Sequence, residues 1–150
     1  MPEQPYPGKL AAEVARLSAH SSLWELACRY AAALDGDDYE ALAACFTGSA
    51  EFVGMAGPPA RGTEAILTYV RQRIAVGQSH RVHVPTNQLI DRLGPETASG
   101  RVHCFAILTS GDGTQRVLSL RYADDYALEG GRWLFARRRI HDAVEVSTAG

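Results

Sequence analysis

The sequence predicts an α+β fold in which helices come first and an antiparallel sheet follows. Apolar residues recur at helical spacing as far as Ile74, whereas from His83 onward they alternate with the period of two that is typical of strands. Short turns containing glycine separate four such segments, and a parallel sheet would need a helix between each pair of strands. A chain of 150 residues is the size of one domain built around one core.

The first half of the sequence contains two candidate helices that begin with a capping box. Ser22 and Glu25 form the first box, so the first long helix is predicted to begin there and to end at the turn of residues 35–37. Asp37 and Glu40 form the second box, which predicts a short helix directly after that turn. The apolar face of the long helix consists of Leu23, Ala27, Tyr30 and Leu34.

The remaining elements follow from turn residues and from the change of period. Residues 46–53 predict a strand, residues 54–59 a turn, and Thr63 caps a third helix that ends at Gly77. The four strands of the meander are predicted at residues 83–91, 97–109, 117–129 and 132–144. Prolines interrupt regular hydrogen bonding near the beginning of the chain. We therefore expect a flexible or partly helical segment at 1–20, the domain at 21–146 and a tail at 147–150.

Composition and charge argue against several classes of protein. The formal net charge is -2 and the basic residues are scattered, so we expect no nucleic-acid partner and no anionic membrane. The chain begins without a basic segment followed by an apolar run, and it lacks a stretch of about 18 apolar residues, so we expect a cytoplasmic protein. Cys28, Cys45 and Cys104 are widely spaced among apolar neighbours, which predicts free thiols rather than disulfides or a zinc site.

Three residues suggest an active site. Asp35 and Tyr30 lie near the end of the first long helix, and His83 begins a predicted strand. A carboxylate beside an imidazole fixes the tautomer of the ring, and a phenol stabilises a developing oxyanion. These groups can remove a proton from carbon and release a leaving group. On a regular helix Tyr30 and Asp35 differ by about 140° of rotation, so they reach one cavity only if the helix ends near Leu34.

Each candidate also has a purely structural interpretation. Asp35 belongs to a sequence, Asp-Gly-Asp-Asp, that favours a turn, so it could simply end the helix. Tyr30 could be a half-buried tyrosine of the core. His83 is predicted to share a strand face with Asn87. His103 shares a face with Arg101 and Phe105, and it remains a second acid, a substrate contact or an ordinary hydrogen-bonded histidine.

Other polar residues are expected to be non-catalytic. His80 with Arg81 is predicted to lie at the surface, and His20 and His141 lie outside the candidate site. No metal ion is expected, because the nearest candidate ligands are His80, His83, His103 and Glu51, which lack the spacing of a metal motif. A phosphate-binding glycine loop and a Gly-x-Ser-x-Gly elbow are also missing from the sequence, so no cofactor is expected.

Two sets of polar residues lie on the later predicted strands, and the sequence does not show which of them point inward. Arg137 to Arg139 alternate between the two faces of a strand, and acidic residues on the neighbouring strand predict cross-strand ion pairs. Tyr122 and Asp124 share one face of a strand with two leucines, and that face points either into a cavity or away from it.

Four segments of the sequence resemble the SnoaL-like branch of the NTF2-like superfamily. They are residues 30–39 (YAAALDGDDY), residues 43–46 (AACF), residues 83–87 (HVPTN) and residues 126–135 (YALEGGRWLF). The likeness extends from about Ser22 to Val144. It implies a cone-shaped fold in which a curved antiparallel sheet wraps around N-terminal helices.

The resemblance also implies roles for individual residues. Asp35 and His83 occupy positions similar to the Asp–His dyad of scytalone dehydratase, hexachlorocyclohexane dehydrochlorinase and bile acid 7α-dehydratase. Tyr30 resembles the tyrosine of the steroid dehydratase, and His103 resembles a second pocket histidine of scytalone dehydratase. Ala106 stands where the steroid enzyme carries an acidic residue, so bile acid is not the expected substrate.

These observations predict a cofactor-independent lyase of the dehydratase type that acts on a small apolar cyclic, polyketide- or steroid-like substrate. The alternatives are a polyketide cyclase or ketosteroid-type isomerase, and a non-catalytic ligand-binding or assembly module. We expect a homodimer or higher homo-oligomer formed through the outer face of the sheet. The residues expected to contact substrate are Asn87, Tyr122, Asp124, Phe52 and Met55.

Overall fold

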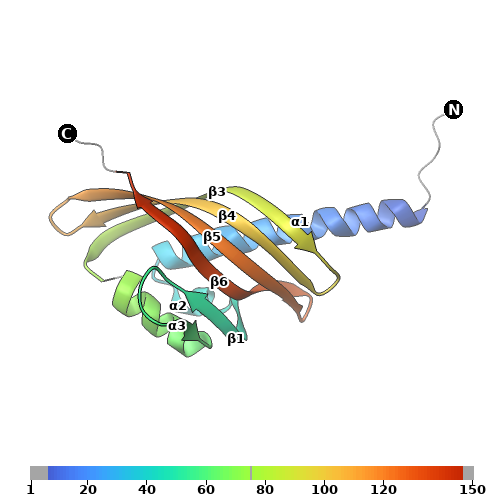
Figure 1. Cartoon of the computed structure of the whole chain (residues 1–150), viewed down its shortest axis with the longest axis horizontal. Coiled ribbons are helices and arrows are strands. Elements are labelled where there is room, and N and C mark those ends of the chain that lie inside the picture. The colour runs from blue at the N-terminus through green and yellow to red at the C-terminus, as the bar shows by residue number, and fades with distance from the viewer. Residues whose placement is uncertain (1–6, 75, 147–150) are drawn as a thin grey trace.

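A computed structural model describes residues 7–74 and 76–146, and it has the predicted α+β architecture (Figure 1). The helices are α1 (Pro7–Asp35), α2 (Tyr39–Ala43), α3 (Thr63–Tyr69) and the π-helical turn η1 (Val70–Ile74). The strands are β1 (Phe46–Val53), β2 (Ala60–Arg61), β3 (Gln78–Leu93), β4 (Thr97–Ser110), β5 (Gln115–Glu129) and β6 (Arg132–Glu145).

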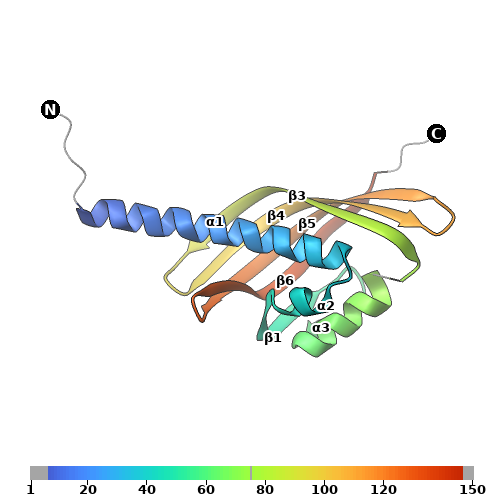
Figure 2. The same cartoon turned by 180° about the vertical axis from the view of Figure 1, so that it is seen from behind.

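The six strands form one curved sheet in the order β2-β1-β6-β5-β4-β3. Strands β3 to β6 form the predicted antiparallel meander. The pairing of β1 with β6 is parallel, which the sequence did not reveal. Helix α1 lies across one face of the sheet, while α2 and α3 lie near β1 (Figure 2). The sheet therefore wraps around the C-terminal half of α1.

The main correction concerns the beginning of α1. The helix begins at Pro7, fifteen residues before the predicted Ser22, and Ser22 lies in its interior. A proline fits the first turn of a helix, and the alanine-rich segment that follows has high helix propensity. The predicted end at Asp35 is confirmed. Asp37, rather than Gly36, adopts the left-handed conformation there, with φ of 53°.

Other boundaries agree with the sequence or differ by a few residues. The bounds of β1 are as predicted, and β2 was missed because two residues carry no periodic signal. The cap of α2 is Asp38 instead of Asp37, since the Asp38 carboxylate accepts a hydrogen bond from the Ala41 amide at 3.0 Å. Strand β3 begins at Gln78, five residues before His83, because its polar first residues pair with the end of β4.

The core has two parts that meet at α1. The larger part lies between the helices, β1 and β6, and includes Leu23, Tyr30, Phe52 and Phe135. The smaller part covers the inner face of β4 and β5 and contacts Ala27. The three cysteines are free thiols, as predicted. Burial raises the pKa of the Cys45 and Cys104 thiols to about 11, so both remain protonated near neutral pH.

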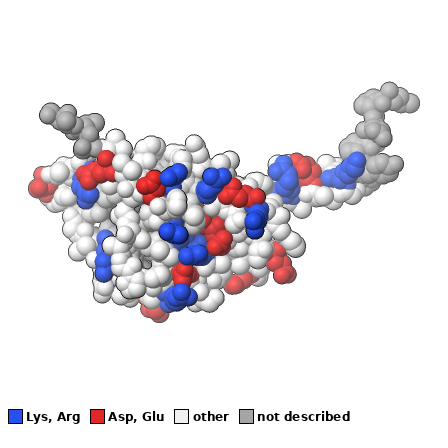
Figure 3. Space-filling view, viewed as in Figure 1, with Lys and Arg blue, Asp and Glu red and all other residues white. Residues whose placement is uncertain are grey.

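Within residues 7–74 and 76–146, no helix is long and apolar enough to cross a lipid bilayer. The face in Figure 3 carries acidic and basic side chains interspersed with one another. Cross-strand ion pairs include Arg101–Asp91, Arg116–Glu145 and Arg121–Asp142.

Candidate active site

The end of α1 and the middle of β3 bring Asp35 and His83 into direct contact. One carboxylate oxygen of Asp35 lies 2.6 Å from Nδ1 of His83, and the other accepts a hydrogen bond from the His83 backbone amide at 2.7 Å. The side chain of His83 is 5% exposed and that of Asp35 is 22% exposed. The carboxylate therefore holds both the ring and the backbone of the histidine.

This arrangement determines which ring nitrogen is free to react. When Nδ1 donates its hydrogen to Asp35, the neutral ring keeps its lone pair on Nε2. His83 borders a cavity whose other lining residues are Ala27, Tyr30, Ala31, Pro85, Val102, Cys104, Tyr122 and Arg138. The cavity volume is about 10 Å³, which is the space of roughly one water molecule. A larger ligand enters only when these side chains move apart.

Tyr30 lines the same cavity and has a buried hydroxyl. The residue is 3% exposed, and its hydroxyl oxygen has no hydrogen-bond partner among the described residues. Burial raises the pKa of this phenol, so it remains protonated and acts as a donor. The rings of Phe46, Tyr122 and Phe135 pack edge-on around it at 5.8 to 6.2 Å. This hydroxyl is therefore free to donate a hydrogen bond to a water molecule or to a ligand.

A buried ion pair lies behind Tyr30. Arg138 donates two hydrogen bonds to the carboxylate of Asp124, each at 2.9 Å, and the Tyr126 hydroxyl donates a third at 3.1 Å. The guanidinium carbon of Arg138 lies 4.3 Å from the ring centre of Tyr30 and 4.0 Å from that of Tyr122. The pair thus places a positive charge next to the phenol.

Arg138 is the main site residue that the sequence analysis did not identify. Arg138 is buried, while its neighbours Arg137 and Arg139 are exposed, as the predicted alternation requires. The predicted cross-strand pairing is confirmed for Arg138 and Asp124. The sequence does contain a signal for this residue. Asp124 shares a strand face with leucines, and if that face is buried, the carboxylate needs a cation on a neighbouring strand.

Arg81 fixes the end of α1 next to the Asp35–His83 pair. Its guanidinium donates to the backbone oxygen of Leu34 at 2.8 Å and to the carboxylate of Asp37 at 2.5 Å. Arg81 is buried, with 4% of its surface exposed, so its predicted position at the surface is wrong. Since β3 begins before His83, both residues belong to one continuous strand. A positive charge at a helix C-terminus is also favourable to the helix dipole.

We expect Arg81→Met to loosen the Asp35–His83 contact without unfolding the protein, because the helix end loses the cation that holds it. The NMR signal of the His83 Nδ1 proton should broaden or disappear in this variant, and Arg81→Lys should restore part of it. Arg139→Met is the matched control, since Arg139 is exposed. An unchanged proton signal in Arg81→Met would show that the helix end holds Asp35 without Arg81.

His103 and Asn87 lie away from this cavity. In β4, Ala106 pairs with His83 and is buried, whereas His103 is exposed on the opposite face of the sheet. The prediction that Asn87 shares a face with His83 is wrong, because β3 has a bulge between Pro85 and Gln88. The bulge turns Gln88 inward, where its amide donates to the Leu23 backbone oxygen at 3.1 Å. Asn87 and His103 instead line a surface hollow with Arg101, Arg121 and His141.

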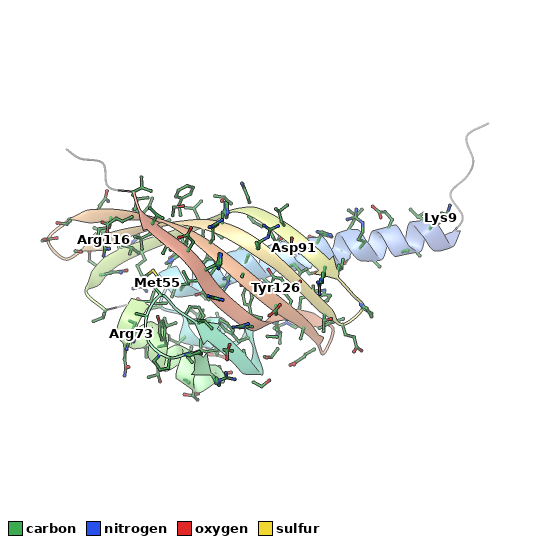
Figure 4. The ribbon with its side chains drawn as sticks, viewed as in Figure 1. Lys9, Met55, Arg73, Asp91, Arg116 and Tyr126 are labelled. Atoms are coloured by element: carbon green, nitrogen blue, oxygen red, sulfur yellow. The ribbon has the colours of Figure 1, made fainter. Side chains whose placement is uncertain are left out.

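The remaining predicted residues are divided between the core and the surface. Tyr122 lines the cavity. Asp124 faces inward, but its carboxylate is already hydrogen-bonded to Arg138. Phe52 is fully buried, with its ring centre 5.3 Å from that of Tyr69. Met55 is 62% exposed on the loop after β1 (Figure 4). The structure therefore brings neither Phe52 nor Met55 to the Asp35–His83 pair.

Possible metal ligands are dispersed in the part of the chain that the structure describes. Its His, Cys, Asp and Glu side chains form no group of three that could hold a metal ion. His80 is exposed on β3, as predicted. The inner face instead holds an imidazole paired with a carboxylate, a buried phenol and a buried cation.

The comparisons with known proteins agree with this architecture. The family model described as a SnoaL-like domain matches residues 15–139. The chain belongs to the SnoaL-like domain family. The matched region of this SnoaL-like protein includes Tyr30, Asp35, His83 and Arg138, so the whole candidate site lies within it. No curated protein matches the chain.

Solved structures show the same fold at low sequence identity. The type 2 hexachlorocyclohexane dehydrochlorinase LinA is 14% identical, with a TM-score of 0.80 over 91% of this SnoaL-like chain and 95% of LinA. A putative scytalone dehydratase from Novosphingobium aromaticivorans is 22% identical, with a TM-score of 0.77 over 89% and 91% of the two chains. An NTF2-like protein from the same species is 22% identical, with a TM-score of 0.75 over 93% and 92%. These structures confirm the predicted NTF2-like fold.

Proposed function

We propose that the protein is a cofactor-independent lyase of the dehydratase type. The observation that carries this proposal is the cavity between His83, oriented by Asp35, and the unpartnered hydroxyl of Tyr30. A base and a neutral donor facing one space suit the removal of a proton next to a carbonyl group. Similarity in fold to a dehydrochlorinase and to a scytalone dehydratase-like protein supports an elimination.

The proposed substrate is a small, largely apolar cyclic β-hydroxy carbonyl compound. Its carbonyl oxygen accepts the hydrogen bond of Tyr30, and its α carbon faces Nε2 of His83. Alanine, valine and cysteine side chains form the apolar part of the lining. Apolar walls exclude water, which strengthens the few polar interactions inside.

The reaction then proceeds in two steps that His83 completes by itself. Nε2 takes the α proton, and the electron pair of the C–H bond forms an enolate whose oxygen is stabilised by the Tyr30 hydroxyl. The enolate collapses to an α,β-unsaturated carbonyl, the bond to the β hydroxyl breaks, and His83 returns its proton to form water. Asp35 stabilises the charged imidazole ring between the two steps.

Arg138 favours the same negative charge on the enolate oxygen through its contact with Tyr30. Its guanidinium lies against the face of the Tyr30 ring, so a positive charge is fixed next to the phenol that donates to the developing enolate oxygen. The Asp124 carboxylate holds this cation in place through two hydrogen bonds. Arg138 thus acts on the phenol without touching the reacting atoms, and we regard it as a positioning residue.

A direct test uses β-hydroxy cyclic ketones in deuterated water, followed by NMR. Formation of the conjugated enone with release of water, dependent on His83, is the expected result. Deuterium incorporation at the α carbon without loss of water would indicate an isomerase or cyclase that uses the same base. If no compound in such a panel binds or exchanges, the site lacks the proposed chemistry and the non-catalytic interpretation gains support.

A further inference from the structure

The N-terminal half of α1 carries an apolar stripe that faces away from the domain. Leu10, Val14 and Leu17 are 53 to 57% exposed, and Trp24 is 38% exposed. Every residue from Gly8 to Ser18 is exposed, and this part of the helix projects past the sheet (Figure 1), with Lys9 near its outer end (Figure 4). A single helical arm of this length is only marginally stable in water unless another surface covers its apolar side.

The spacing of the stripe is that of a helix made to pack against another helix. Its members follow at alternating steps of four and three residues, which are the core positions of a heptad repeat. They are Leu10, Val14, Leu17, Ser21, Trp24 and Cys28. The stripe thus continues from the free arm onto the half of α1 that is anchored in the domain.

This stripe is distinct from the face that packs on the sheet. At about 100° per residue, its centre lies about 165° around the helix from the buried face formed by Leu23, Leu26 and Tyr30. Helix α1 therefore has two apolar faces, and the sheet covers only one of them. In Figure 2 the helix lies on the outside of the molecule in that view, so a partner can approach its second face.

We propose that the stripe pairs with the same stripe of a second copy of this chain, with the two α1 helices antiparallel. A twofold axis near residue 19 aligns the stripes over residues 10–28. Leu10 then meets the partner's Cys28, Val14 meets the partner's Trp24, and Leu17 meets the partner's Ser21. Each pair joins an a position to a d position, which is the packing of antiparallel coiled coils.

The antiparallel orientation follows from where α1 is anchored. Residues 21–28 are held rigidly, because Leu23, Leu26 and Ala27 are buried in the core. Antiparallel pairing lays each free arm on this rigid part of the partner, whereas parallel pairing would leave the two arms supported only by each other. Antiparallel helix dipoles also attract, and parallel ones repel.

The size of the contact indicates a weak dimer. The overlap of 19 residues is about 28 Å long, and a helix is roughly 10 Å wide, so the contact covers about 280 Å² on each copy and on the order of 600 Å² on the two together. This area is below the roughly 1,200 Å² of stable specific interfaces and is in the range of weak, transient contacts. We therefore expect dimerisation to depend on protein concentration.

The register can be tested by cross-linking. Leu10→Cys places a thiol opposite the partner's Cys28, and oxidation with copper phenanthroline should join the two chains through this pair of thiols. Peptide mapping identifies the linked residues, and addition of Cys28→Ser should abolish the antiparallel cross-link. A cross-link between the two introduced thiols would show parallel pairing and overturn the proposed orientation.

The choice of surface can be tested by sedimentation of the intact chain. Leu17→Glu should shift the monomer–dimer equilibrium toward monomer by at least tenfold. The matched control is Phe105→Glu, because Phe105 is 44% exposed on the outer face of the sheet and lies outside the stripe. A wild-type protein that remains monomeric at millimolar concentration, or a dimer lost only in Phe105→Glu, would overturn the proposal.

Discussion

Asp35→Asn is expected to lower turnover by two to four decades while the protein remains folded. Two donors of His83, its backbone amide and its Nδ1–H, are satisfied by the two oxygens of one carboxylate. An asparagine offers only one oxygen. If that oxygen accepts from the backbone amide, the new NH₂ group donates to Nδ1, the ring proton moves to Nε2, and the lone pair that takes the substrate proton is lost.

The tautomer gives a readout that needs no substrate. Nitrogen-15 shifts of the His83 ring should report protonated Nδ1 in the wild type and protonated Nε2 in Asp35→Asn. Asp91→Asn serves as the matched control, since Asp91 is an exposed carboxylate paired with Arg101. An Asp35→Asn protein with nearly full turnover would remove the carboxylate from the mechanism, whatever the tautomer.

Substitutions of His83 and His103, which the sequence analysis assigned to one site, are expected to have different effects on turnover. His83→Gln should abolish turnover, because glutamine cannot accept and return a proton in this position. His103→Gln should leave it unchanged, since His103 lies on the opposite face of the sheet.

Local signals in the sequence were sufficient to predict the Asp35–His83 pair, but they did not predict the elements around it correctly. The turn chemistry after Asp35 marks the end of a helix, and the segment that begins at His83 resembles a family strand, so both residues could be placed from the chain alone. The capping box at Ser22 is an equally local signal, yet it was wrong. A capping box pairs the free backbone amides of a helix's first turn, so it has this role only where a helix begins. Here the alanine-rich residues before Ser22 are already helical, and Ser22 lies inside the helix.

Bulges explain most of the remaining differences. Strict alternation assigns Asn87 to the face of His83, but the bulge after Pro85 shifts the next paired residues, Gln88 to Ile90, by one position. A register shift between Asp125 and Tyr126 on the β5–β6 ladder likewise lets Phe135 and Arg138, three residues apart, both face inward. A single sequence carries little signal for such insertions, because the extra residue is compensated only by pairing with a distant strand.

Arg138→Met should be the most destabilising of the proposed substitutions, lowering the free energy of unfolding by about 3 to 5 kcal/mol. The change leaves the Asp124 carboxylate buried without its cation, and it removes the guanidinium that stacks between the aromatic rings. Burial already raises the pKa of the Asp124 carboxyl, and Arg138 opposes this effect. Without Arg138, the carboxyl should take up a proton on folding.

Urea denaturation of matched variants separates the ion pair from simple loss of packing. Arg121→Met breaks an exposed pair with Asp142 and should stay close to wild type. Adding Asp124→Leu to Arg138→Met should recover part of the loss, because the unpaired charge disappears together with its partner. If the double variant is no more stable than Arg138→Met alone, the cost lies in the aromatic stacking of the guanidinium. In that case the cation next to Tyr30 is held by the rings as much as by the carboxylate.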